Sequence, residues 1–166
     1  MVEAIRLILS HIPVIMFIAA IAIALLTKSP AYFPARLLGW MLLLSVGVEE
    51  TWAGLFHVAF PHLAANSIGW DVSPFQFEIG VADIAIGLTA IASFWRSLAF
   101  KAATVSYVTL FYAGVAIGHV REAVSSGNFS ANNFGALLLI TVIKIFLLPT
   151  LYLMAKRNDS TRALGG

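Results

Sequence analysis

Long apolar runs separated by short polar breaks dominate this chain. A membrane core about 30 Å thick requires roughly 20 apolar residues in a helix that rises 1.5 Å per residue. Five runs reach this length, at residues 6–27, 35–60, 75–95, 98–123 and 133–155. They are almost continuously apolar and do not alternate, which excludes the strands of a membrane barrel. The pattern predicts an all-α, polytopic transmembrane helical bundle with five spans.

We expect residues 1–156 to form a single transmembrane helical domain, followed by a polar C-terminal tail at residues 157–166. Local signals mark two of the helix starts. Ser73, Pro74 and Gln76 have the spacing of a capping box with proline at the first helical position. Asn132 or Asn133 is suited to cap the last span. Residues 61–72 are expected to form the longest loop.

Composition narrows the class of protein. Hydrophobic residues make up 60% of the 166 positions and charged residues only 11%, whereas soluble domains carry roughly 25% charged residues. A soluble enzyme is therefore excluded. The chain has no cysteine, which rules out disulfides, thiolate metal sites and cysteine nucleophiles. The excess of ten Lys and Arg over eight acids is too small to indicate a nucleic-acid partner.

The basic residues predict the orientation, because cytoplasmic loops carry the excess of Lys and Arg. With five spans, only Arg6 and Arg121 fall on one side of the membrane. The opposite side collects Lys28, Arg36, Arg96, Lys101, Lys156, Arg157 and Arg162. This asymmetry places the N-terminus outside and the C-terminus in the cytoplasm. We expect a multi-pass protein of the cytoplasmic (inner) membrane whose partners include membrane lipids.

Four charged residues lie deep in the predicted spans. Glu49, Glu50, Asp83 and Lys144 fall about 12–17 Å below the outer surface, at a cost of roughly 2.5–3.5 kcal/mol each on the insertion scale. Three acids and one base leave an excess of carboxyl groups, so either some acids are protonated or a cation balances them. One hypothesis is that Glu50, Asp83 and Lys144 relay protons or tune charge. The alternative is a structural Lys144–carboxylate pair beside neutral carboxyls that hydrogen-bond neighbouring helices.

A second group of polar residues lies nearer the predicted outer surface. His57, Glu78, His119 and Glu122 are all able to bind metals, and His119 and Glu122 stand three positions apart on one helix face. Two histidines and two carboxylates suit a divalent metal such as Zn²⁺, Fe²⁺ or Mn²⁺. The alternative is that the histidines donate interhelical hydrogen bonds and that Glu122 pairs with a basic residue or a lipid head group.

Glycines accompany both polar groups. Gly47, Glu50, Gly54 and His57 fall within about 80° of arc on one helix, so this face is predicted to point inward and to let a neighbouring helix approach closely. Gly114 and Gly118 form a GxxxG pair beside His119. That pair predicts a helix contact, either inside the bundle or between protomers, and the oligomeric state is left open.

Several short motifs occur together between residues 50 and 135. These are Glu50-Thr51-Trp52-Ala53-Gly54 with His57 and Pro61, Ser67-Ile68-Gly69-Trp70, Ser73-Pro74-Phe75-Gln76-Phe77-Glu78-Ile79-Gly80, Gly118-His119 and Gly127-Asn128-Phe129. In order and spacing the chain resembles an uncharacterised family of small bacterial integral membrane proteins. The resemblance implies a compact helical membrane bundle and supplies no activity.

Three functions fit the sequence. In the leading one, His57, Glu78, His119 and Glu122 bind a divalent metal for redox chemistry or for ion or proton movement, with Glu50, Asp83 and Lys144 beneath them. The first alternative is metal-independent acid–base catalysis on a lipid-like substrate, with His57 or His119 as base, and aromatic residues around a pocket would favour it. The second is a non-catalytic accessory subunit of a larger membrane complex. Whether the protein is an enzyme is left open.

Overall fold

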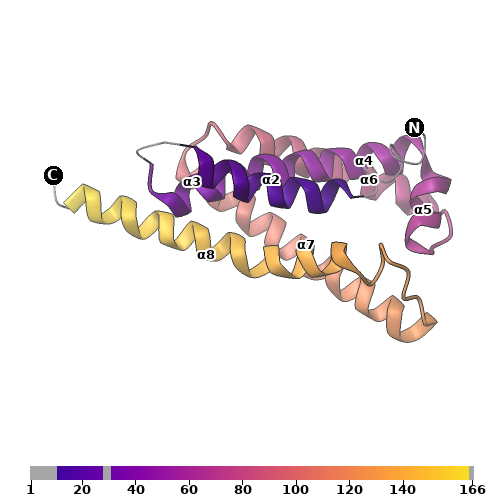
Figure 1. Ribbon diagram of the computed structural model, residues 1–166. Helices are drawn as coiled ribbons and strands as arrows, with labels where there is room; N and C mark the ends of the chain where they lie inside the picture. The colour runs from indigo at the N-terminus through magenta and orange to yellow at the C-terminus, as the bar shows by residue number, and fades with distance from the viewer. Residues whose placement is uncertain (1–10, 28–30, 165–166) are drawn as a thin grey trace.

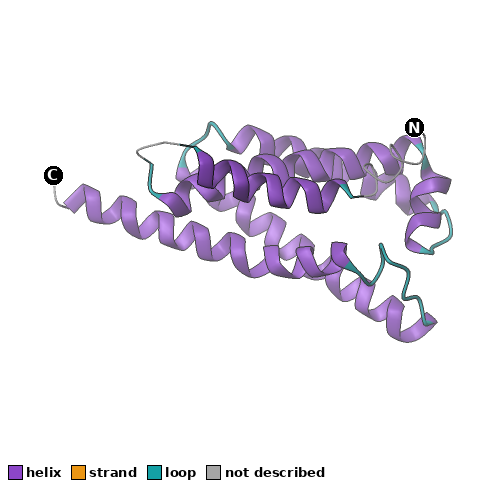
Figure 2. Cartoon of the chain, in the orientation of Figure 1, coloured by secondary structure: helices purple, strands orange, loops and turns teal. Residues whose placement is uncertain are grey.

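The structure is a computed structural model that describes residues 11–27 and 31–164. Within these residues the chain forms helices joined by short loops and contains no strand (Figure 2). In chain order the elements are α2 (Ile12–Leu26), α3 (Phe33–Trp40), the π-helix η1 (Met41–Val48), α4 (Glu49–Ala59), α5 (Pro61–Ile68), α6 (Pro74–Ser93), α7 (Leu98–Ser126) and α8 (Ala136–Leu164). The predicted all-helical fold is confirmed.

Three helices of the described chain are each long and apolar enough to cross a membrane. They are α6, α7 and the Ala136–Thr161 part of α8. The apolar helix α2 is shorter, with 15 residues. The segments α3, η1 and α4 follow one another without a break from Phe33 to Ala59. The beginning of the first predicted span, including Arg6, and the basic residue Lys28 lie outside the described residues.

Two segments differ from the sequence prediction. Residues 61–72 do not form a simple loop, because α5 occupies Pro61–Ile68, with proline in its first turn and Gly69 in the left-handed conformation at its end, at φ 74°. These are ordinary start and stop signals of a helix. At the other end of the chain, α8 continues as a helix through Leu164. The polar residues after 156 therefore extend the last helix.

The predicted helix caps are not formed. Ser73 precedes α6 but makes no side-chain hydrogen bond to the first turn. The side chain of Gln76 turns instead toward α4 and the start of α5. Asn133 does not cap α8, which begins at Ala136, because its amide bonds to other partners. Both polar side chains serve tertiary contacts in place of local ones.

The helices are arranged in two layers. One layer contains α2, the continuous helix α3–η1–α4, and α6, and both α2 and α6 pack against the continuous helix. The second is the hairpin of α7 and α8, which lies against α3 at one end of the molecule. From that end the hairpin spreads away from the first layer toward α5 (Figure 1). The layers therefore meet at one end and diverge at the other.

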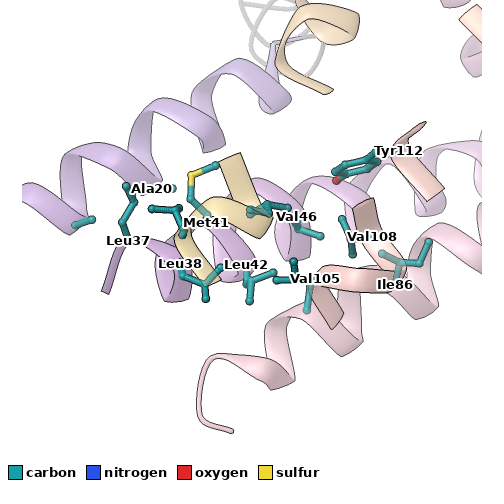
Figure 3. Close-up of a cluster of buried hydrophobic side chains, with 14 residues drawn as sticks. Ala20, Leu37, Leu38, Met41, Leu42, Val46, Ile86, Val105, Val108 and Tyr112 are labelled. Carbon is teal, nitrogen blue, oxygen red and sulfur yellow. The ribbon is translucent and has the colours of Figure 1, made fainter. Parts of the chain in front are cut away.

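Apolar side chains fill the region where the layers meet. Leu38, Met41 and Leu42 from the first layer are fully buried, and they belong to the same cluster as Val105 and Val108 of α7 (Figure 3). Burial of such side chains contributes roughly 1.5–3 kcal/mol each in water-soluble reference systems. The Tyr112 side chain lies at the edge of this cluster. Beyond Tyr112, the interior between the two layers changes from apolar side chains to polar groups.

Glycines bring α4 and α6 into close contact. A Cβ atom on Gly54 would meet the backbone of Gly80, and a Cβ atom on Gly87 would meet the backbone at Gly47 and Thr51. The predicted inward face of the second span is therefore used as a glycine contact, as expected for closely packed membrane helices. By contrast, nothing lies within 4 Å of a Cβ placed on Gly114 or Gly118. Within the described chain their predicted helix contact is not made.

Candidate functional site

Lys144 lies at the centre of a buried polar network between the two layers. Its side chain is 0% exposed and forms a salt bridge with Glu49, at 2.8 Å between Nζ and Oε1. The same ammonium donates to the backbone oxygen of Ser45 at 3.0 Å and to the hydroxyl oxygen of Tyr112 at 3.2 Å. A lysine ammonium has three N–H donors, so all of them are used. Lys144 therefore neutralises Glu49 and leaves no proton of its own for a bound molecule.

The second oxygen of Glu49 has no hydrogen-bond partner within the described part of the chain. This atom, Oε2, is buried, and the whole residue is only 4% exposed. Buried carboxylate oxygens are almost always hydrogen-bonded, because an unpaired one retains the cost of losing its water. Glu49 also lines the cavity described below. The free oxygen is thus an acceptor that a molecule in the cavity could satisfy.

Two further carboxyl groups lie beside this network. Glu50 is close enough to interact with Glu49, with Lys144 and with the Tyr112 hydroxyl, and Asp83 of α6 is close enough to interact with Glu50. Both side chains are buried. The three acids that the sequence placed at one depth are therefore neighbours in space. Together, Glu49, Glu50 and Asp83 form what is here termed the carboxyl floor.

A cavity of about 680 Å³ lies over the carboxyl floor, between the two layers. Small-molecule pockets in proteins commonly measure about 300–1,000 Å³. Most of its lining is apolar, and aromatic side chains enter from several elements: Trp70, Phe75, Phe111 and Tyr112. The cavity occupies the region where α7 and α8 diverge from the first layer. It therefore combines apolar walls with an acidic base.

The structure does not assemble the predicted metal site. His57, Glu78 and His119 line the cavity, whereas Glu122 does not. No group of three or more histidine, cysteine, aspartate or glutamate side chains able to hold a metal ion is found among the described residues. Each histidine instead bonds an amide side chain through Nδ1, and Glu78 is exposed. Similar depth on separate helices is therefore not enough to bring the four side chains into one group within the described residues, and metal binding stays a prediction.

The segment around α5 connects the two layers at the end where they diverge. The Asn128 side chain, in the loop between α7 and α8, donates to the backbone oxygens of Ile68 at 2.8 Å and Gly69 at 3.3 Å. Trp70 stacks on the His119 ring, with 5.6 Å between ring centroids and 29° between planes. Trp70 and His119 both line the cavity. This contact forms part of the cavity wall on the side of α5.

Three residues of the site were missed at the sequence level. Tyr112 was not distinguished from the apolar residues around it, although a tyrosine in the middle of a span usually needs a hydrogen-bond partner. The sequence predicts that Gln76 and Asn133 are helix caps, whereas both side chains bond histidines. A polar residue in the first turn of an apolar helix, with a histidine at a similar depth on another predicted span, is the signal that could have identified Gln76.

An all-helical chain with three membrane-length helices and buried charges is typical of an integral membrane protein. Residues 10–161 match a family described as a family of unknown function (DUF6790). The chain belongs to this family. No curated protein and no solved structure matches it. The expected membership in an uncharacterised family is therefore confirmed.

Proposed function

We propose that the protein binds a small amphipathic molecule in the cavity, with the polar end of that molecule on the carboxyl floor. The unpartnered, buried Oε2 of Glu49 is the observation that carries this proposal, because it requires a hydrogen-bond donor. Glu50 and Asp83 add acidic groups that Lys144 does not contact directly. The polar end is therefore a donor with positive charge, such as an ammonium group.

The walls of the cavity determine the rest of the molecule. Apolar and aromatic side chains surround the space above the floor, and they gain most from contact with hydrocarbon. A hydrocarbon body that carries an amine satisfies both regions. In this proposal Glu50 and Asp83 exchange protons with the bound amine, as carboxyl groups shielded from water are suited to do. The aromatic lining also favours the acid–base alternative, in which His57 or His119 is the base.

We also propose that the chain crosses a cytoplasmic (inner) membrane five times, with the N-terminus outside. The spans are α2 with the residues before it, the continuous helix Phe33–Ala59, α6, α7 and α8. The described basic residues Arg36, Arg96, Lys101 and Lys156 belong to the end where the layers meet, which the excess of positive charge assigns to the cytoplasm. In this orientation the α5 end of the cavity faces outward.

Three probes with one hydrocarbon cage test the binding proposal. They are 1-aminoadamantane, 1-adamantanol and adamantane-1-carboxylate, which are cationic, neutral and anionic at neutral pH. Binding is measured by calorimetry on the protein in nanodiscs of zwitterionic lipid, with empty nanodiscs as the blank. We expect the ammonium probe to bind about tenfold more tightly than the carboxylate, because a charge-assisted hydrogen bond favours it.

Matched variants test whether the carboxyl floor causes the preference for the ammonium probe. Glu50→Gln and Asp83→Asn are expected to remove most of it, since each replaces a floor carboxyl with an amide of the same size. Glu122→Gln is the control, because Glu122 does not line the cavity. Equal affinity for all three probes, or an ammonium preference that survives both floor variants, would refute the proposal. Parallel titration with Zn²⁺ and Mn²⁺ on wild type and His57→Ala would show whether a metal competes for this site.

A further inference from the structure

Two histidines reach the cavity from opposite layers. His57 belongs to α4 and His119 to α7, and both line the same space. Each ring has one nitrogen in a hydrogen bond with an amide side chain. A neutral imidazole has one N–H donor and one acceptor nitrogen, so the partner of one nitrogen determines the role of the other. The amide partner of each histidine therefore determines whether the other ring nitrogen donates or accepts a hydrogen bond.

The partner of His57 is an N–H donor. Gln76 Nε2 lies 2.7 Å from the backbone oxygen of Pro61, and a carbonyl oxygen only accepts. This contact fixes which end of the Gln76 amide is the NH₂ group. The same nitrogen lies 3.2 Å from His57 Nδ1, so it donates its second hydrogen to that atom. His57 Nδ1 is then the acceptor, and the ring proton sits on Nε2.

The partner of His119 is an acceptor. Asn133 Nδ2 donates to the backbone oxygen of Asn128 at 2.7 Å, which fixes the amide so that Oδ1 faces His119. Asn133 Oδ1 lies 2.7 Å from His119 Nδ1, and this oxygen only accepts. His119 Nδ1 therefore carries the ring proton, and Nε2 has a free lone pair. Asn133 is fully buried, and Trp70 stacks on the His119 ring. The orientation of the ring is therefore fixed both by a hydrogen bond and by an aromatic contact.

We propose that His57 and His119 are fixed in opposite neutral tautomers, so that the α4 wall donates and the α7 wall accepts a hydrogen bond. The inference rests on the proposed function for its ligand and deepens it. A bound molecule that uses both walls needs an acceptor toward His57 and a donor toward His119. A hydroxyl group supplies both, whereas an ether supplies only the acceptor. The cavity therefore selects an amphipathic alcohol or amino alcohol, with His119 as its base.

The tautomers can be measured without any ligand. The protein is labelled with ¹⁵N in its histidine rings, and two-bond ¹H–¹⁵N correlation spectra are recorded in nanodiscs at about pH 8.5, where ordinary histidines are neutral. His57→Gln and His119→Gln assign the two rings by loss of their signals. We expect an unprotonated Nδ1 in His57 and a protonated Nδ1 in His119. The same tautomer in both rings, the reverse pair, or an averaged mixture would overturn the assignment.

A variant of the amide partner Gln76 tests whether this side chain fixes the tautomer of His57. In Gln76→Leu, His57 is expected to lose its single tautomer while His119 keeps its own. An unchanged His57 spectrum in this variant would show that Gln76 does not fix the ring. Because the wild-type spectrum is read first, the assignment does not depend on how well the variant folds.

A pair of ligands tests the selectivity. 1-Adamantanol and 1-methoxyadamantane share one cage and differ in whether the oxygen carries a proton. We expect the ether to bind about tenfold more weakly than the alcohol, the loss that follows when one hydrogen bond to the half-buried His119 ring is missing. In His119→Phe this difference is expected to disappear. Equal binding of alcohol and ether in the wild type would refute the selectivity even if the ammonium probe still binds, which separates this inference from the proposed function.

Discussion

At the residue scale the central feature is a lysine whose three N–H groups are all used. Lys144 bonds Glu49, the Ser45 carbonyl and Tyr112, and its contact with the Tyr112 ring, at 4.4 Å from Nζ to the ring centroid, adds a cation–π interaction. A saturated ammonium is a structural cation. It holds Glu49 in place while one oxygen of that carboxyl stays free for the cavity.

The residue-scale prediction concerns this pair. Lys144→Met keeps the approximate length of the side chain but leaves Glu49 buried without its cation, and we expect a loss of about 3–5 kcal/mol in stability. The double variant Lys144→Met/Glu49→Gln removes both charges and is expected to recover much of that loss. Thermal unfolding midpoints in detergent, followed by tryptophan fluorescence, measure both effects.

Lys156→Met is the matched control for that series. It removes a lysine from the same helix at an exposed position, so the midpoint is expected to change little. If the double variant is as unstable as Lys144→Met alone, the ion pair is not the reason that Lys144 matters.

The sequence predicts the buried charges and, in one of its two interpretations, a Lys144–carboxylate pair, which the salt bridge with Glu49 confirms. Glu49, Glu50, Asp83 and Lys144 are conspicuous because charges in apolar runs are costly, and their common depth follows from helix rise. The depth of a residue in its span does not determine how that helix is rotated about its own axis relative to the other helices. For this reason Tyr112 was missed, and Glu122 was grouped with histidines whose cavity it does not line.

At the scale of elements, close packing of α4 on α6 creates a rigid first layer. Gly47 and Gly54 face Gly80 and Gly87 so closely that their backbones touch. This contact positions Glu50 and Asp83 on adjacent helices at the same height. The π-helix Met41–Val48 directly precedes Glu49 and supplies the Ser45 carbonyl that bonds Lys144. Stretches of π-helix are often found at functional sites.

The element-scale prediction compares two glycines. In Gly54→Ala the new methyl group would meet the backbone of Gly80 and Ile84, so the helices must separate, at a cost of about 1–3 kcal/mol. In Gly114→Ala the methyl group meets nothing within 4 Å, and the better helix propensity of alanine is expected to leave stability unchanged or raised. Thermal unfolding compares the two. Equal midpoints would contradict the close packing of α4 on α6.

Helix positions were the most predictable part of the fold. The apolar runs at 75–95 and 98–123 correspond to α6 and α7 within a few residues, because membrane-length hydrophobicity is a strong signal. Helix α5 was not predicted, since an eight-residue helix lies below the length that apolar runs reveal. The extension of α8 beyond 156 was also missed, because polar composition does not by itself end a helix.

At the scale of the whole molecule, two layers that meet at one end and diverge at the other create the cavity. The apolar core seals the meeting end, and the contact of α5 with the loop after α7 bridges the diverging end. A molecule in the cavity therefore lies between the apolar core at one end and the contact of α5 with the loop after α7 at the other end. This arrangement could not be derived from the sequence, because hydropathy does not determine which spans are neighbours.

The proposed orientation predicts which exposed positions are reached from outside. Because the chain has no native cysteine, single variants report one site each. Ser126→Cys at the end of α7 is expected to react with a membrane-impermeant maleimide added to intact cells, whereas Arg157→Cys in α8 is expected to react only after permeabilisation. Gel shifts of the labelled protein measure both. The reverse pattern would place the cavity on the cytoplasmic side.

Protection of a cavity thiol by the ammonium probe is the most direct test of the account. Ala82→Cys places a thiol in the cavity lining, and Ser126→Cys places one at the exposed end of α7. The rate of reaction with N-ethylmaleimide is measured in nanodiscs with and without 1-aminoadamantane. We predict that the probe slows the Ala82→Cys reaction about tenfold or more at saturation and leaves the Ser126→Cys reaction unchanged. Equal rates with and without bound probe at Ala82→Cys would contradict the claim that this cavity is the binding site.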